Sequence, residues 1–377
     1  MSLVFRLASR NLLHDRLRFV ATVVGIVFSM VLVTVQIGLF LSFDRMVTTM
    51  IDRASADLWI MPRGTKCFED SSMLDERERF RALSINGVAA ATPLLAGFSQ
   101  WRLPSGGITP VIIIGSDMRA PGLHPWNLVA GSLEALAVPD AVAVDQTYFE
   151  RLGTTGLGDS AEIRDQKAQV AAVTRGIRSF ATTPYVFAPI ERARVYMGTA
   201  PNKASYFLVR LAPNAHLASV RSRLRLSLAD AEVLTSAEFR WRSASFWLFG
   251  TGAGAALFAG ALLGIIVGTI IVAQTLYAST KDHLNEFATL RAIGSSGRYI
   301  YKVIIWQALI SAVVGFCIAA GIGFLVVRTT AESALPVIMT PGLTMGLFVL
   351  TVVMCVLSAI AAIVQVTRID PAMVFTR

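Results

Sequence analysis

The pattern of apolar and charged positions divides the chain into four long apolar stretches separated by polar segments. Asp, Glu, Lys and Arg are absent from residues 19–43, 244–280, 303–327 and 333–367. A membrane-spanning helix needs about 20 apolar residues, so each stretch is long enough to cross a bilayer. The pattern therefore predicts four transmembrane helices, at 19–43, within 244–280, at 303–327 and at 341–367.

The segment between the first two spans, residues 44–243, has a different pattern. Short β-rich runs bounded by Gly, Pro or Asp alternate with two amphipathic helical stretches, at 75–83 and 216–228. The β-rich runs lie at 57–61, 109–115, 141–144, 169–174, 185–190 and 205–211. About 200 residues suffice for an independent core. The expected fold is therefore an α-helical membrane protein with four transmembrane helices and a mixed α/β extracytoplasmic domain inserted between the first and second.

Composition and charge agree with a multi-pass membrane protein. Of the 377 residues, 54% are hydrophobic and 16% charged, and the net charge of +9 is concentrated beside the spans, while the middle segment is nearly balanced. Positive charge flanking spans marks their cytoplasmic ends. This places both termini in the cytoplasm, with an interfacial helix at 1–18 and a tail at 368–377. It leaves little support for nucleic-acid binding.

The same rule assigns the remaining connections. The loop 281–302, which carries Lys281, Arg291, Arg298 and Lys302, is expected in the cytoplasm, and the short link 328–340 outside. The first apolar stretch is longer than the roughly 7–15-residue core of a secretory signal, so we expect a retained helix. Cys67 is the only cysteine of the middle segment, which excludes a disulfide within it, and neither the three cysteines nor the four histidines have metal-ligand spacing.

The second apolar stretch exceeds one bilayer crossing, which predicts a stalk followed by a transmembrane helix over 244–280. Five side chains before and within it are expected to form an interface belt: Arg240, Trp241, Arg242, Trp247 and Phe249. Glycines recur at near four-residue spacing at Gly250, Gly254, Gly260, Gly264 and Gly268. Such spacing lets helix backbones approach closely in lipid, and both packing within the chain and a homodimer contact remain open. A dinucleotide-binding loop is disfavoured because no strand precedes these glycines.

The cytoplasmic loop after this span is more elaborate than a chain reversal requires. As a helix it would place Leu284, Phe287 and Arg291 on one side, and Gly294 lies where a capping glycine would end it. Residues 4–18 have a comparable amphipathic pattern. The loop is either a connection whose charges merely orient the spans or a helix that docks on a cytoplasmic partner.

Three segments resemble a known family. The stretch LNEFATLRAIGSSGRYIYKVII at 284–305 is similar to the segment after the second span of MacB/FtsX-type ABC transporter permeases, and the sequences at 8–12 and 368–375 resemble that family's terminal signatures. The run ADLWIMPRGT at 56–65 most resembles DevC-type permease subunits. The resemblance implies a homodimeric permease whose ATP and Mg²⁺ are bound by a separate cytoplasmic ABC ATPase dimer. It also implies a periplasmic adaptor and an outer-membrane channel as further partners.

The resemblance also assigns a role to the loop. In the family this segment is a coupling helix docked on the ATPase, and the matching positions here are Glu286, Phe287, Leu290, Arg291, Ala292, Ile293 and Gly294. Phe287 stands where the family usually has an aliphatic residue, and Ser295 where it often has alanine. The chain contains no G-x-x-x-x-G-K-[ST] motif, no catalytic motif and no metal-ligand set, so no cofactor is expected in this chain.

The function implied is mechanotransmission. ATP hydrolysis by the partner would move the extracytoplasmic domain of an inner-membrane permease and export an amphipathic substrate. Two alternatives remain open. One is a non-transporting relay to cell-wall enzymes like that of FtsX, and the other is a lipoprotein-releasing permease, which would commonly need a paired, non-identical subunit.

Overall fold

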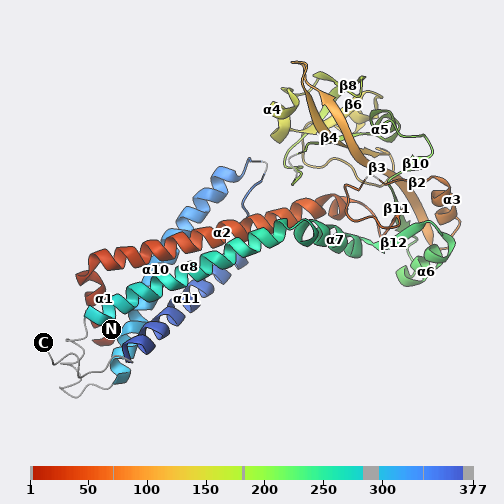
Figure 1. The fold of residues 1–377 in the computed structure, drawn as a ribbon. Helices are drawn as coiled ribbons and strands as arrows, with labels where there is room; N and C mark the ends of the chain where they lie inside the picture. The colour runs from red at the N-terminus through yellow and green to blue at the C-terminus, as the bar shows by residue number, and fades with distance from the viewer. Residues whose placement is uncertain (1–2, 71, 181–182, 283–296, 334, 368–377) are drawn as a thin grey trace. The chain divides into compact units, whose positions relative to one another are not determined.

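A computed structural model of the chain describes residues 3–70, 72–180, 183–282, 297–333 and 335–367 (Figure 1). The chain divides into two compact units. The helical unit contains residues 1–42, 255–331 and 336–377, and the inserted domain contains residues 43–254 and 332–335. Each unit is described by itself.

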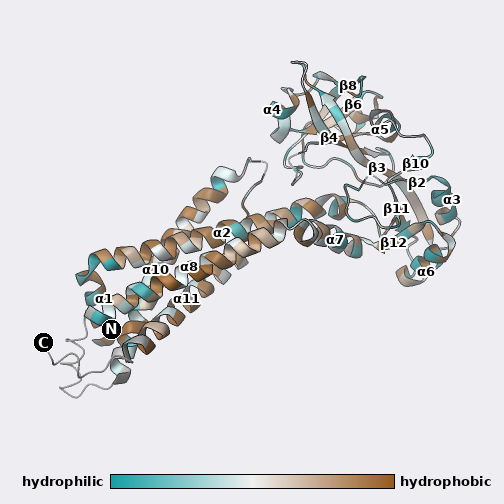
Figure 2. Cartoon of the chain, in the orientation of Figure 1, coloured by the Kyte–Doolittle hydropathy of each residue, from teal (hydrophilic) through white to brown (hydrophobic). Residues whose placement is uncertain are grey.

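Five helices form the described part of the helical unit. They are α1 (Leu3–His14), α2 (Arg16–Arg53, whose last turns belong to the inserted domain), α8 (Ala253–Asp282), α10 (Gly297–Thr330) and α11 (Pro341–Thr367). The last four are each long and apolar enough to cross a membrane, and their apolar character is visible along their length (Figure 2). These four helices, with the domain inserted between the first and second, confirm the expected fold class.

The core of the helical unit contains side chains from all four long helices, several of them small. Its buried members include Ile26, Met30, Val33, Val272, Leu276, Ile304, Ala308, Ala312, Cys355, Ala359 and Ala362. Small side chains let the helix backbones approach closely, which is how helices associate where lipid supplies no hydrophobic driving force.

The inserted domain is mixed α/β. Its strands are β1 (Leu58–Pro62), β2 (Leu74–Asp75), β3 (Val88–Arg102), β4 (Ile108–Ser116), β5 (Leu128–Gly131), β6 (Ala141–Asp145), β7 (Ser160–Ile163), β8 (Gln166–Thr174), β9 (Tyr185–Pro189), β10 (Lys203–Ala204), β11 (Tyr206–Leu211) and β12 (Ala231–Thr235). Its α-helices are α3 (Arg77–Leu83), α4 (Phe149–Leu152), α5 (Ile190–Met197), α6 (Leu217–Ser227) and α7 (Ser236–Ser245). Short 3₁₀ segments lie at Glu134–Ala137 and Gln146–Tyr148.

One sheet connects almost all of these strands. Its order is β12-β1-β11-β3-β4-β9-β6-β8-β5, with β7 pairing both β3 and β8, so β3, β4, β9, β6, β8 and β7 close a circuit of pairings. The long strand β3 joins this circuit to the remaining strands β11, β1 and β12 of the same sheet, and α6 packs against β12. Alternate residues of the strands serve different cores: Ile112 and Ile114 pack in one, Val111 and Ile113 in another.

The structure contains elements that the sequence pattern did not indicate. The chief one is β3, whose interior holds Pro93 and Gly97, residues that normally interrupt strands. Its neighbours β11 and β4 pair along it and override the local preference, with Pro93 opposite Phe207 and Gly97 opposite Ile113. Pairing with neighbouring strands, rather than local sequence preference, therefore makes this segment a strand.

The segment 244–280, expected as a stalk followed by a transmembrane helix, is not one continuous helix. Helix α7 ends at Ser245, a π-helical turn follows at Phe246–Gly250, and α8 starts at Ala253. The Thr251 N–H donates to the Phe246 carbonyl at 3.1 Å, and Gly252 has φ +77°, a left-handed conformation that glycine adopts without strain. We call residues 246–252 the π junction.

Candidate functional site

Two arginines of α7 tie this helix to other parts of the inserted domain. Arg240 bridges two carboxylates on the last turns of α2, with Nε 3.1 Å from Asp52 and Nη2 3.3 Å from Asp44. Arg242 forms two 2.6 Å hydrogen bonds to Glu232, which lower the pKa of that carboxyl. Both arginines were expected in the interface belt; in the structure they are partly exposed and each is paired with carboxylates of the inserted domain.

Trp247 of the π junction is bonded to a buried carboxyl group. Its Nε1 donates to Glu69 Oε2 at 3.0 Å, and the Tyr185 hydroxyl donates to Glu69 Oε1 at 2.9 Å. Glu69 is only 6% exposed, and burial raises its pKa, although these hydrogen bonds partly oppose the shift. The Trp247 ring also contacts Phe180, with centroids 4.0 Å apart. Glu69 and Trp247 therefore fix the π junction to the domain.

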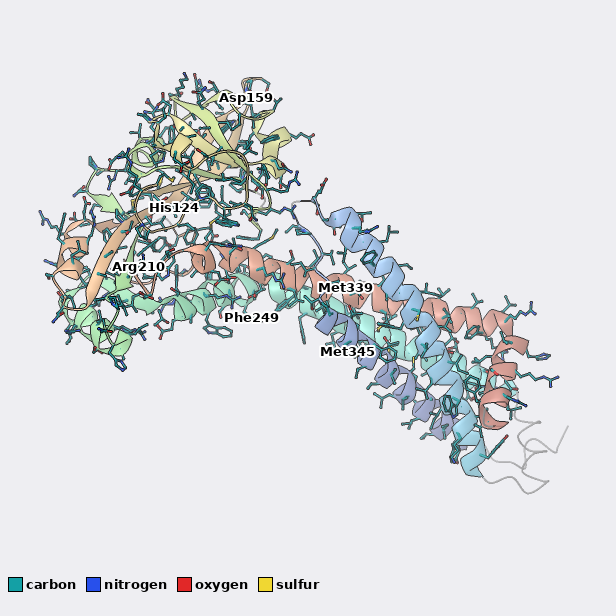
Figure 3. The ribbon with its side chains drawn as sticks, turned by 180° about the vertical axis from the view of Figure 1, so that it is seen from behind. His124, Asp159, Arg210, Phe249, Met339 and Met345 are labelled. Carbon is teal, nitrogen blue, oxygen red and sulfur yellow. The ribbon has the colours of Figure 1, made fainter. Side chains whose placement is uncertain are left out.

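The most exposed members of the expected belt are two aromatic side chains. Trp241 is 70% exposed and Phe249, in the π junction, is 62% exposed. The Phe249 side chain is labelled in Figure 3. Aromatic side chains in such positions suit a lipid headgroup region.

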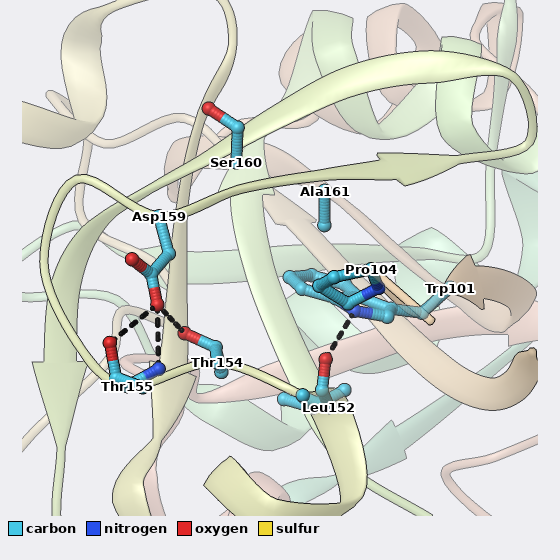
Figure 4. A pocket seen from close by; sticks show the side chains of 9 residues that line it. Trp101, Pro104, Leu152, Thr154, Thr155, Asp159, Ser160 and Ala161 are labelled. Carbon is cyan, nitrogen blue, oxygen red and sulfur yellow. Dashed lines mark hydrogen bonds between the residues drawn. The ribbon is translucent and has the colours of Figure 1, made fainter. Parts of the chain in front are cut away.

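A pocket of about 250 Å³ lies between the β3–β4 turn and the loop before β7 (Figure 4). Asp159 Oδ2 accepts hydrogen bonds from the hydroxyls of Thr154 and Thr155 and from the backbone N–H of Thr155, and these bonds lower its pKa. The Trp101 indole donates to the Leu152 carbonyl at 3.0 Å. These polar groups hold the loop together, so the arrangement serves its structure rather than catalysis. Within the described residues there is no group of His, Cys, Asp and Glu that could hold a metal ion.

Three of the singled-out glycines lie where α8 meets α2. A Cβ at Gly260 would be 2.6 Å from Gln36, at Gly264 3.1 Å from Val33, and one at Gly268 would overlap Ser29. The Ser29 hydroxyl donates to the Gly264 carbonyl across this contact. Gly250 lies in the π junction and Gly254 at the start of α8, where a Cβ would meet Phe246 and Leu248, respectively. In the structure, Gly260, Gly264 and Gly268 thus pack within the chain.

The N-terminal helix α1 packs along α10. The rings of Phe5 and Trp306 meet edge to face with centroids 5.5 Å apart, and Ala8 and Asn11 are buried, while Arg10 is exposed. The apolar and charged sides of this helix are those that its sequence pattern predicts.

The interior of the helical unit contains no buried charge in the part of the chain that the structure describes. Its buried polar side chains are uncharged, with Gln307 the largest of them. Ionisable groups usually mark a polar path through a membrane protein. The described helices show no such path.

Comparison with known protein families identifies the family to which the chain belongs. A family model for the MacB-like periplasmic core domain matches residues 19–226, more than half of the chain, and a model for the FtsX-like permease C-terminal region matches residues 246–371. The chain belongs to the MacB/FtsX-type permeases. The second match spans α8, α10 and α11 of this permease.

Relatives of the permease are known by sequence and by structure. Uncharacterized ABC transporter permeases of Mycobacterium tuberculosis (strain CDC 1551 / Oshkosh) and Mycobacterium bovis (strain ATCC BAA-935 / AF2122/97) are each 24% identical to it, over 384 and 390 residues, with 98% of both chains covered. The crystal structure of the periplasmic region of MacB from Actinobacillus actinomycetemcomitans matches 51% of this chain and 94% of its own at 10% identity, with a TM-score of 0.37.

The expected coupling residues of the permease, Glu286 to Gly294, lie outside the described residues, between the end of α8 at Asp282 and the start of α10 at Gly297. Their role stays a prediction. Sequence reasoning missed Glu69, because one carboxyl in the run CFED looks like ordinary surface charge. Its burial follows from contacts with Tyr185 and Trp247, which lie more than 100 residues away along the chain.

Proposed function

We propose that this permease is the transmembrane subunit of a mechanotransmission-type ABC transporter that exports an amphipathic substrate. The lack of buried charge in the described helical unit is the observation that carries the proposal, because a channel for a polar solute would need such groups. Movement of the inserted domain, on the outer side of the inner membrane, then drives export of the substrate. ATP chemistry takes place in another protein.

A separate cytoplasmic ATPase dimer supplies that chemistry. The chain has no G-x-x-x-x-G-K-[ST] loop to cradle phosphates, and relatives of the same length are named as ABC transporter permeases. The loop 281–302 is the proposed docking element, with Leu290, Ala292 and Ile293 as its apolar contacts and Glu286 and Arg291 as its charged ones.

Two features of the structure support transmission along helices. Helix α2 has no break from Arg16 to Arg53, and Arg240 holds its last turns to α7. The π junction then leads from α7 into α8, with Trp247 bonded to Glu69. A continuous helix and a fixed junction can pass a displacement from one end of a span to the other. A periplasmic adaptor, an outer-membrane channel and the kinship with DevC-type subunits are parts of the same proposal.

Purification of the complex from native membranes tests the proposal. We expect an ABC ATPase and an adaptor to accompany the permease, and mass spectrometry to find a bound amphipathic molecule. A cell-wall hydrolase in place of the adaptor would instead favour the relay, and a second, non-identical permease would favour lipoprotein release. A permease that never associates with an ATPase would contradict the proposal.

A further inference from the structure

An open groove lies on the surface of the helical unit between α2 and α10. Its volume is about 520 Å³, and all the side chains that line it are apolar. They include Val24, Val27, Phe28 and Val31 of α2 and Ile318 and Ile322 of α10. Val24 is 58% exposed and Phe28 59%, so no described side chain covers them. Both helices are long and apolar enough to cross a membrane, which places the groove at the depth of the hydrocarbon core.

The groove has about the length of one membrane leaflet. It extends along α2 over residues 23–35, which is roughly 18 Å along the helix axis. Half of a hydrocarbon core about 30 Å thick is about 15 Å. The groove therefore suits the acyl chain of a lipid in a single leaflet.

Exposed arginines precede the groove along the chain. Arg10 of α1 and Arg16 at the start of α2 are both exposed, and among the described residues no carboxylate forms an ion pair with either. The carboxylate of Asp15, which lies between them in the sequence, pairs with Arg18 instead, at 3.1 Å. Two guanidinium groups are thus available to an anion at this end of α2.

Arg16 is placed to act together with the groove. It precedes Val23, the first lining residue, by seven positions, which is about two helical turns and roughly 10 Å along the axis. Residues seven apart lie on the same side of a helix. A guanidinium group binds phosphate through paired N–H donors. The apolar groove with a cation beyond one end is therefore complementary to a molecule that has an acyl chain and an anionic headgroup.

A protein segment fits this combination less well than a lipid does. A transmembrane helix of another protein would cover the apolar side chains but would leave Arg16 without an anion. A second copy of the chain, in the same orientation in the membrane, would bring its own Arg16 to the same depth, and like charges repel. A phospholipid supplies both the acyl chain and the negative charge.

We propose that the groove between α2 and α10 binds one anionic phospholipid, with an acyl chain along Val24 and Phe28 and the phosphate at Arg16. The site does not depend on the proposed function, because the lipid is a bound component of the permease and not the exported molecule. A ligand that binds only the folded protein also stabilises it, so this lipid should strengthen the packing of α2 with α10.

Lipid titration of the delipidated, full-length permease, followed by native mass spectrometry, tests the headgroup contact. The probes are phosphatidylglycerol and phosphatidylcholine with identical acyl chains, which differ in headgroup charge. We expect one phosphatidylglycerol per chain to bind more tightly than phosphatidylcholine. Arg16→Gln should weaken phosphatidylglycerol binding about 5-fold and leave phosphatidylcholine binding unchanged. The matched control is Arg328→Gln, an exposed arginine near the other end of α10, which should change neither.

A substitution in the groove tests the acyl-chain contact. Val24→Trp fills part of the groove and should weaken the binding of both lipids. Val349→Trp is the control, because Val349 on α11 is 53% exposed and does not line the groove. Thermal unfolding without lipid shows that each variant is folded. Added phosphatidylglycerol should raise the unfolding temperature of the unmodified chain more than that of Val24→Trp or Arg16→Gln.

Three results would overturn the proposal. The first is equal affinity for the two lipids that Arg16→Gln leaves unchanged. The second is a folded Val24→Trp variant that binds both lipids as the unmodified chain does, which would place the lipid elsewhere. The third is a change of oligomeric state in Val24→Trp, measured by light scattering, without a change in lipid binding, which would mean that protein covers the groove. None of these results involves the ATPase, so each would leave the proposed function standing.

Discussion

At the scale of single residues, Glu69 shows how the inserted domain holds the start of the second transmembrane segment. The side chains that donate hydrogen bonds to its carboxyl are those of Tyr185 and Trp247, both uncharged. A buried carboxylate without a cation is costly, and each donor it loses adds to that cost. Burial also raises the pKa of the Cys67 thiol, to about 12, so this cysteine is inert at neutral pH.

Replacing Trp247 tests the bond to Glu69. Trp247→Phe keeps a ring beside Phe180 but removes the indole donor, leaving a buried acceptor unpaired. We expect a loss of about 1–3 kcal/mol in the free energy of unfolding, measured by denaturation of the purified permease in detergent. The matched control is Trp241→Phe, because that ring is 70% exposed, and it should change stability by less than about 0.5 kcal/mol. Equal effects would mean that the bond contributes nothing.

Protonation of Glu69 gives the stability of the domain a pH dependence. Burial raises the pKa of Glu69 in the folded state above its unfolded value, so the folded protein binds this proton more tightly. Its contribution is complete below the unfolded pKa and is lost as the pH rises through the folded pKa. Glu69→Gln, which cannot ionise, should therefore lose less stability than the parent between pH 5 and pH 8. Parallel unfolding curves across that range would contradict this.

At the scale of elements, the contact of α2 with α8 depends on glycines whose spacing was visible in the sequence. The sequence could not say which helix they face, because lipid, a second copy and another span all accept small residues. It also predicted six β-rich runs and two helices of the domain, all of which the structure contains. It missed β3, since Pro93 and Gly97 oppose a strand locally, and the π junction, since Gly250 also fits the near four-residue glycine spacing of a packed helix.

A pair of alanine substitutions tests the helix contact. A Cβ at Gly268 would overlap Ser29, whereas Gly321 on α10 has nothing within 4 Å of the same position. Gly268→Ala should therefore destabilise the helical unit by about 1–3 kcal/mol through overpacking, and Gly321→Ala should be close to neutral. Thermal unfolding in detergent compares them. If the two variants unfold alike, α2 and α8 are not in close contact there.

At the scale of the whole molecule, the spans of the permease carry no buried charge in their described parts, and we propose that the inserted domain performs the function. This requires the inserted domain and the loop 281–302 to lie on opposite sides of the membrane. The apolar pattern alone fixed the number of spans, because only long uncharged runs can cross a bilayer. The sequence contains no comparable pattern that identifies the substrate, and the described helical unit has no buried charge that could bind a polar one.

Reporter fusions test this topology. A reporter joined after Arg240 should be active only on the outer side of the membrane, and one joined after Arg298 only in the cytoplasm. The positive charges at the ends of the spans give the physical reason. The reverse result would invert the topology and place the inserted domain beside the ATPase.

The most direct test of the central claim is the ATPase activity of the assembled complex with Leu290→Asp in the permease. A charge at the centre of the proposed docking helix should disrupt its apolar contact with the ATPase. We expect the variant to insert normally but to lose stable association and permease-dependent ATP hydrolysis, while Ser295→Ala, which introduces the residue that the family often has at this position, retains both. Normal assembly and coupled hydrolysis in Leu290→Asp would contradict the claim that the ATPase docks on this loop and is coupled to the permease through it.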